Sequence, residues 1–142
     1  CQIVEGTIES AKIWEDKEFM AILDMYPNTQ GQTLVLTKKH FPSDPLAMPT
    51  NIYKQYLQAA RTAMELLKKK LNVSRVALVI EGMEIAHAHI KLYPLHGVQE
   101  KSRHIVAPGE AFFETYAGYI TTHHGPRKDL AELMELAKKI RA

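Results

Sequence analysis

The sequence A-H-A-H-I-K-L-Y-P at residues 86–94 alternates basic and apolar side chains with a period of two. His87, His89 and Lys91 are the basic members of this alternation. On a β-strand, the period places them on one face and the apolar groups on the other, with successive basic groups roughly 7 Å apart at about 3.4 Å per residue. Pro94 fits a strand end, because proline has no ladder donor. This basic row suits a substrate with several negative charges.

Four other segments have strand-like composition. Residues 75–80 are nearly continuously apolar, which predicts a strand covered on both faces. The opening residues 1–10 predict a short helix or turn, and residues 16–17 a tight turn between strands. The predicted strands cover residues 11–15, 18–23, 32–37, 75–80 and 86–94.

One long helix is predicted over residues 51–71, with Thr50 as its N-cap. Its apolar positions recur at three- and four-residue spacing. They are Tyr53, Tyr56, Leu57, Ala60, Ala63, Met64, Leu67 and Leu71. Three prolines in residues 41–49 predict an irregular connector before the helix, and Asp129 is expected to cap a final helix through residue 142.

The order of these elements predicts an α+β domain. We expect a mostly antiparallel five-stranded sheet with the long helix packed on it, followed by a C-terminal helical extension. Residues 1–97 would form the core, and residues 98–142 an extension of the same single domain.

Composition limits the classes of function. The 142 residues are 46% apolar and 24% charged, which is typical of a globular protein. The formal charge of +2 gives little reason to expect nucleic acid as a partner. Cys1 is the single cysteine, so no internal disulfide can form, and no apolar run approaches the ~20 residues of a membrane span. We therefore expect a cytoplasmic protein without a membrane association.

Several segments, taken in order and spacing over residues 1–94, resemble the histidine triad (HIT) superfamily. They are K-I-W-E-D at 12–16, A-I-L-D-M-Y-P at 21–27, G-Q-T-L-V-L-T-K-K-H at 31–40 and H-A-H-I-K-L-Y-P at 87–94. The resemblance implies an α+β fold, a homodimer, and a nucleotide hydrolase or transferase. In this family the middle histidine attacks the α-phosphate and forms a nucleotidyl-histidine intermediate.

The resemblance also implies roles for individual residues. His89 would be the nucleophile, His87 the supporting first histidine, and Lys91 the third member of the catalytic row. Without the resemblance, a histidine pair of this kind is more often structural than catalytic, and it could equally ligate zinc with further ligands. Asp24 could be no more than a turn residue bonded to its own backbone. The predicted nucleotide-binding residues are Asp24 at the ribose hydroxyls, Ile22 and Met25 beside the base, and Ile3 lining the same pocket.

Two features depart from the family pattern. Lys91 stands where the third histidine belongs, and residues 81–85 lack the asparagine and Gly-Gln-Ser or Gly-Gln-Thr of many relatives. A strand lysine can extend to water, but its place beside both histidines favours phosphate contact. Family branches with glutamine at the third position act as nucleotidyltransferases or phosphorylases, so the departure does not imply an inactive protein.

Cys1, His40 and His87 resemble part of a zinc site in some bacterial HIT proteins. Those proteins use a second cysteine upstream of the position of Cys1, and this sequence has no second cysteine. Because a structural zinc site needs four ligands, we expect neither a metal nor a cofactor.

The sequence therefore predicts an enzyme that acts on dinucleoside polyphosphates or related nucleotides. The alternative is a nucleotide-binding or partner-binding module that has lost turnover, which the third-position lysine and the altered loop would explain.

Overall fold

The structure is a computed structural model that describes residues 2–98, 107–121 and 125–130, together with residues 132, 136, 140 and 141. The chain divides into two compact units, Cys1–Ser102 and Arg103–Ala142. In the second unit, residues 130, 132, 136, 140 and 141 are helical, and the remainder of the predicted final helix lies outside the described residues. The assignment of residues 98–142 to the same domain as the core stays a prediction.

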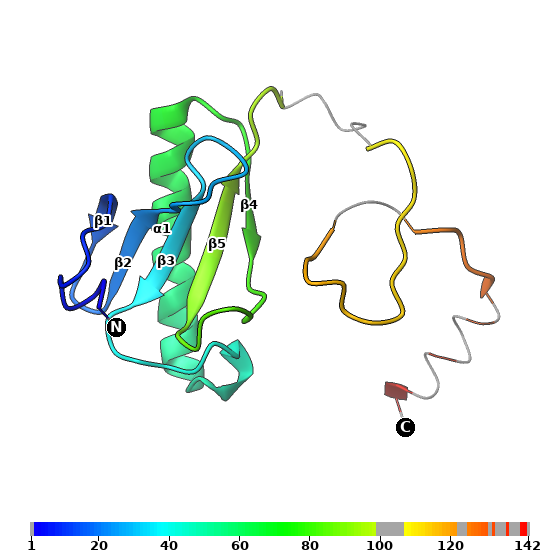
Figure 1. The fold of residues 1–142 in the computed structure, drawn as a ribbon, viewed down its shortest axis with the longest axis horizontal. Coiled ribbons are helices and arrows are strands. Elements are labelled where there is room, and N and C mark those ends of the chain that lie inside the picture. The colour runs from blue at the N-terminus through cyan, green and yellow to red at the C-terminus, as the bar shows by residue number, and fades with distance from the viewer. Residues whose placement is uncertain are drawn as a thin grey trace. The chain divides into compact units, whose positions relative to one another are not determined.

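The first unit contains a five-stranded sheet in the order β1-β2-β3-β5-β4, with every neighbouring pair antiparallel. Its strands lie side by side with the long helix α1 behind them (Figure 1). This arrangement confirms the predicted α+β class. The strands are β1 Lys12–Glu15, β2 Phe19–Leu23, β3 Thr33–Thr37, β4 Val76–Val79 and β5 His89–Pro94.

Helix α1 spans Thr50–Leu71. The prediction of Thr50 as N-cap is wrong by one residue, because Thr50 is already helical and Pro49 occupies the cap position. The Pro49 carbonyl accepts the first helical bond, from the Tyr53 N–H at 2.9 Å, and no side chain caps this end. The connector before the helix is irregular as predicted, apart from a short 3₁₀ helix, Pro45–Ala47.

The main core lies between α1 and the sheet. Small residues on the helix let its backbone approach the strands, and the Tyr56 ring stacks on Phe19 with centroids 5.5 Å apart. Ile90 and Leu92 of β5 are fully buried against this face. The predicted apolar stripe therefore faces the sheet. The buried helix residues are Tyr56, Ala59, Ala60, Ala63 and Leu67.

A smaller apolar cluster covers the opposite face of the sheet. Met20, Ile22 and Leu36 are buried there, and Ile3 and Leu34 pack against them together with Val4. Residues 2–8 form turns, as predicted for the opening segment. The N-terminal segment therefore shields apolar strand residues that would otherwise face water.

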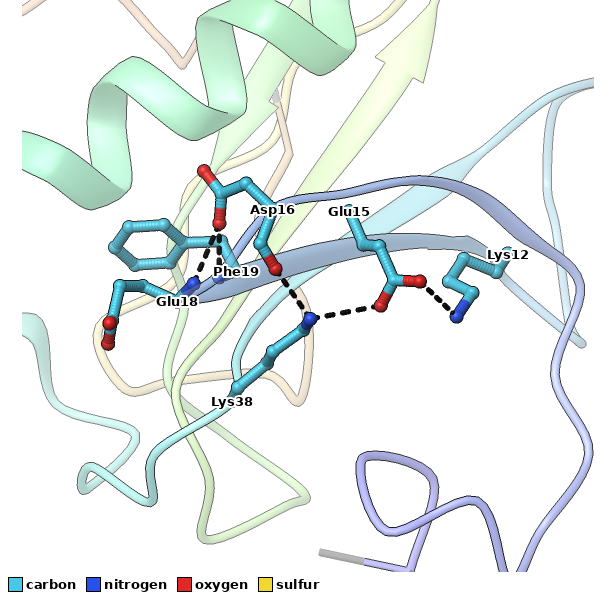
Figure 2. Close-up of polar contacts among 6 residues, drawn as sticks. All are labelled: Lys12, Glu15, Asp16, Glu18, Phe19 and Lys38. Atoms are coloured by element: carbon cyan, nitrogen blue, oxygen red, sulfur yellow. Dashed lines mark hydrogen bonds and ion pairs between the residues drawn. The ribbon is translucent and has the colours of Figure 1, made fainter.

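The β1–β2 turn is held by polar contacts (Figure 2). The Asp16 carboxylate accepts hydrogen bonds from the backbone N–H groups of Glu18 and Phe19 at 2.8 and 2.7 Å. The Lys38 ammonium donates to the Asp16 carbonyl at 2.5 Å and lies 3.0 Å from a Glu15 carboxylate oxygen. These contacts fix the turn, whose connection of three residues, 16–18, is one residue longer than predicted.

Two strand predictions need correction. Strand β5 begins at His89 and not at residue 86 as predicted, because residues 83–87 form tight turns. In these turns the Ile85 N–H donates to the Met83 carbonyl, and the His87 N–H donates to the Ile85 carbonyl. Strand β4 is not covered on both faces within this chain. Leu78 pairs with the buried Leu92, yet it is 38% exposed, because the core under α1 does not extend over it. Among the described residues, no helix is both long enough and apolar enough to cross a membrane.

Candidate functional site

The strand register places three of the predicted site residues, Ile22, His89 and Lys91, on the sheet face opposite α1. Leu36 pairs with both Met20 and His89, and these three side chains form one row across the sheet. In the next row, Leu34 pairs with Ile22 and Lys91. Strands lie about 4.8 Å apart, so Lys91 is roughly 10 Å from Ile22 along its row. The basic groups therefore border the apolar cluster on the same face.

The His89 ring is oriented by a hydrogen bond to the backbone. Its Nδ1–H donates to the His87 carbonyl at 2.8 Å, because a carbonyl oxygen can only accept. In the neutral ring this tautomer leaves the lone pair on Nε2. The residue is only 4% exposed, but in the described part of the chain every fully buried side-chain nitrogen has a hydrogen-bond partner. The Nε2 atom of His89 has no hydrogen-bond partner among these residues, so it is not one of the fully buried nitrogens. It therefore lies at the exposed edge of the ring.

His87 is held away from the strand by its own contacts. Its Nε2–H donates to the Thr37 carbonyl at 2.7 Å, with the Thr37 hydroxyl at 3.2 Å. Its Nδ1 lies 3.3 Å from Nδ1 of His40. Burial lowers the pKa of His87, the bond to Thr37 opposes this, and the rings of His40 and His89 lower it further. His87 is therefore a neutral anchor whose backbone carbonyl orients His89.

Lys91 does not extend freely into water. Its Nζ lies 3.1 Å from Oε2 of Glu81 and 3.9 Å from Oε2 of Glu84. Burial alone would lower the pKa of Lys91, but the carboxylates of Glu81 and Glu84 and the Tyr93 phenol outweigh it, so the pKa is raised. The ammonium is therefore charged at neutral pH. Glu81 and Lys91 are ten residues apart in the sequence, and no local pattern predicts this ion pair.

Asp24 is fixed by two hydrogen bonds. The side-chain amide of Gln32 donates to Oδ2 at 2.6 Å, and the Tyr26 N–H donates to Oδ1 at 2.9 Å. The second bond is the turn contact expected of an aspartate in this position. Gln32, which closes the β2–β3 loop opposite Asp24, is a further site residue that the sequence prediction missed. The antiparallel pairing of the flanking strands was the signal that could have identified it.

The predicted nucleotide-binding side chains are brought together in part. Ile22 is buried and Ile3 packs on the same cluster, in agreement with a shared apolar wall. Met25 is 78% exposed and does not contribute to that wall. Whether any of these side chains contacts a nucleotide stays a prediction.

Tyr93 is a second residue that the sequence prediction missed, although it continues the alternation of His89 and Lys91. Burial raises the pKa of its phenol, Lys91 opposes this, and the carboxylates of Glu81, Asp24 and Glu84 raise it further. Tyr93 thus lies within the electrostatic reach of both the predicted ribose-binding residue and the Lys91 ion pair.

The described residues do not bring four metal ligands together. Within the described ranges, no group of three or more His, Cys, Asp and Glu side chains converges as metal ligands. His40 and His87 supply only two facing nitrogens. Cys1, the third residue considered from the sequence, lies outside the described residues, so this hypothesis stays untested.

A cavity of about 290 Å³ lies elsewhere, where β2, β3 and the start of α1 meet. Phe19, Thr37 and Ile52 contribute to its lining. Its lining includes none of the predicted catalytic or nucleotide-binding residues. The sheet face that carries His89, and not this cavity, is therefore the candidate site.

Comparison with known proteins identifies relatives of the whole first unit. The HIT domain family model matches residues 5–98. An uncharacterized HIT-like protein of Methanocaldococcus jannaschii is 30% identical in an alignment of 98 positions that covers 66% of this chain and 75% of that protein. A Streptococcus mutans crystal structure has a TM-score of 0.70 and 25% identity, covering 99% of this chain and 81% of that one.

A crystal structure described as a HIT family hydrolase from Legionella pneumophila has a TM-score of 0.56 at 23% identity. The match covers 72% of this chain and 95% of that chain, and it establishes a shared fold. The match to the family model includes all five strands of the sheet and helix α1. This chain belongs to the HIT domain family.

Proposed function

We propose that this protein is a HIT-type nucleotide hydrolase or nucleotidyltransferase that acts on the α-phosphate of dinucleoside polyphosphates or related nucleotides. The observation that carries the proposal is the His89 ring, whose Nδ1–H bonds the His87 carbonyl at 2.8 Å and leaves Nε2 as the nucleophilic atom. A fold neighbour from L. pneumophila is described as a HIT family hydrolase, which supports the proposed reaction class.

The proposed reaction has two displacements. The His89 Nε2 lone pair forms a bond to the α-phosphorus, and the bond from phosphorus to the leaving-group oxygen breaks with its electrons on that oxygen. Water, or phosphate in a phosphorolytic variant, then forms a new P–O bond while the P–N bond breaks. The attacking water loses its proton to solvent. Lys91 donates hydrogen bonds to the phosphate oxygens on which negative charge develops, and this chemistry uses no cofactor.

Nucleotide binding would use the remaining residues of the same face. The Asp24 carboxylate, fixed by Gln32, would accept hydrogen bonds from ribose hydroxyls. Ile22 and Ile3 would provide the apolar wall for the base. The Met25 side chain is largely exposed, so it would contact only the outer edge of the base.

A nucleotide screen tests the proposal. Thermal-shift measurements with mononucleotides and dinucleoside polyphosphates should identify the nucleotide that stabilises the fold, because a ligand that binds only the native state raises the melting temperature. Chromatography of the products should then show cleavage at the α-phosphate. Stabilisation without product formation would instead favour the alternative below.

The alternative is a nucleotide-binding module without turnover. A specific observation favours it: Glu81 and Glu84 lie 3.1 and 3.9 Å from Lys91 and compensate its positive charge. Carboxylates at this position would repel an anionic leaving group. The product analysis distinguishes the two candidates.

Lys91 should favour substrates whose leaving group needs no proton. A raised pKa keeps the Lys91 ammonium charged and makes it a poor proton donor at neutral pH. An amine that leaves from a phosphoramidate requires a proton, whereas a nucleotide leaves as a stabilised anion. We expect kcat/KM to be higher for dinucleoside polyphosphates than for nucleoside phosphoramidates, and Lys91→His to narrow the difference. Steady-state assays of both proteins with both substrates check this, and a wild type that prefers the phosphoramidate contradicts it.

We also propose a homodimer, since β4 is an outermost strand and Leu78 leaves apolar surface exposed along it. The expected interface comprises residues 75–80 and part of α1. Light scattering at micromolar concentration should give twice the mass of the chain, and Leu78→Lys should shift it toward the monomer. A wild type of monomeric mass would argue against the interface. Location in the cytoplasm stays a prediction from the sequence.

A further inference from the structure

We propose that Glu81 is a positioning residue that holds the Lys91 ammonium beside His89, at the place where substrate phosphate would bind. This inference rests on the proposed function. The Lys91 Nζ lies 3.1 Å from Glu81 Oε2, and the two side chains are only 16% and 11% exposed. An ion pair with this degree of burial is restricted far more than a pair on the open surface.

The backbone around Glu81 is itself constrained. Glu81 follows β4, which pairs with β5 so that Val79 lies opposite Lys91. The next residue, Gly82, has a φ of +73°, and a Cβ there would approach the Ser43 carbonyl oxygen to 3.0 Å. A glycine is therefore strongly favoured at position 82, and the connector of residues 41–49 passes close to the loop that carries Glu81.

A fixed lysine differs functionally from a mobile one. The lysine side chain has a flexible four-carbon stem, and its ordering normally costs entropy when a ligand binds. The ion pair has already ordered the stem before the substrate arrives. An ammonium has three N–H donors, and the bond to Glu81 uses one of them. The other donors remain for phosphate oxygens, so Lys91 is a preorganised donor.

Glu84 offers a matched comparison on the same loop. Its carboxylate lies 3.9 Å from the Lys91 Nζ, but its side chain is 74% exposed. The groups that act on the Lys91 ammonium are Glu81, Glu84 and the Tyr93 phenol, with His89 two residues away on the same strand. The Glu81 carboxylate is nearer to the Lys91 ammonium than that of Glu84, and its side chain is less exposed. Replacing Glu81 should therefore change kcat more than replacing Glu84.

Glu81→Gln should lower kcat by about tenfold, because the Lys91 ammonium loses its fixed position. KM should change little or fall, because the positive charge of Lys91 is then no longer balanced by the Glu81 carboxylate and attracts the anionic substrate. The alkaline limb of the kcat–pH profile should move to lower pH. Glu84→Gln should change kcat less than about twofold. A purely structural role for Glu81 would lower thermal stability and leave the pH profile unmoved.

A second measurement on the full chain requires no turnover. The ¹³Cε resonance of Lys91, identified by its loss in Lys91→Met, reports both side-chain order and ionisation. We expect Lys91 to be ordered in the wild type and in Glu84→Gln, and mobile with a lower pKa in Glu81→Gln. Equal behaviour of the two glutamine variants would overturn the proposal. If the wild type forms no nucleotidyl intermediate, the proposed function fails, and the Lys91 resonance alone decides whether Glu81 positions the ammonium.

Discussion

His89→Ala is expected to lower kcat by roughly 10⁴-fold or more while nucleotide affinity stays within a few-fold of the wild type. The substitution removes the atom that would bond to phosphorus, and the apolar wall and Asp24 remain in place. Single-turnover kinetics with a dinucleoside polyphosphate measures the first effect, and calorimetric titration with the mononucleotide measures the second.

His87→Ala is the matched control, because it keeps the backbone carbonyl that bonds His89 Nδ1. It removes the contacts with Thr37 and His40 that anchor that backbone. We therefore expect a loss of activity smaller than that of His89→Ala. Near-normal activity of His89→Ala together with an inactive His87→Ala would reverse the assigned roles.

Ile90→Ala is expected to destabilise the fold by about 2–5 kcal/mol, the range for truncating a fully buried aliphatic side chain. Ile90 is 0% exposed and lies between the two basic residues of β5, with its side chain in the core below α1. Its loss would leave a cavity beneath the strand that carries His89. Urea denaturation followed by circular dichroism measures the change.

Leu46→Ala supplies the comparison, since Leu46 is 90% exposed in the connector. We expect it to change the free energy of unfolding by less than about 0.5 kcal/mol. If Ile90→Ala also costs less than about 1 kcal/mol, the core does not close over β5 as described.

The sequence predicted the fold well where periodicity reflects burial. The alternation around Ile90 and Leu92 and the helical spacing of Tyr56, Ala60 and Ala63 each mark the side that faces the core, and the structure places them there. Periodicity carries little information about element ends. This explains the one-residue error at Thr50, whose residue type suits a cap although the proline before it occupies that position.

The site could be predicted only in part, because its geometry depends on contacts that are distant in sequence. The alternation suggested that His87 shares the strand with His89, but tight turns and the bonds to Thr37 hold it before the strand begins. The partners of Asp24 and Lys91 come from another segment in each case. No local pattern specifies such pairs, although strand pairing could have placed Gln32 opposite Asp24.

The central claim is that His89 Nε2 becomes bonded to the α-phosphorus of a nucleotide. Rapid acid-free quenching of the wild type with a dinucleoside polyphosphate, followed by intact-mass and peptide mass spectrometry, tests it directly. We predict a transient mass increase of one nucleotidyl group that maps to His89 and is absent from His89→Ala. Product formation without any nucleotidyl-protein species, or a nucleotidyl group attached to another residue, would contradict it.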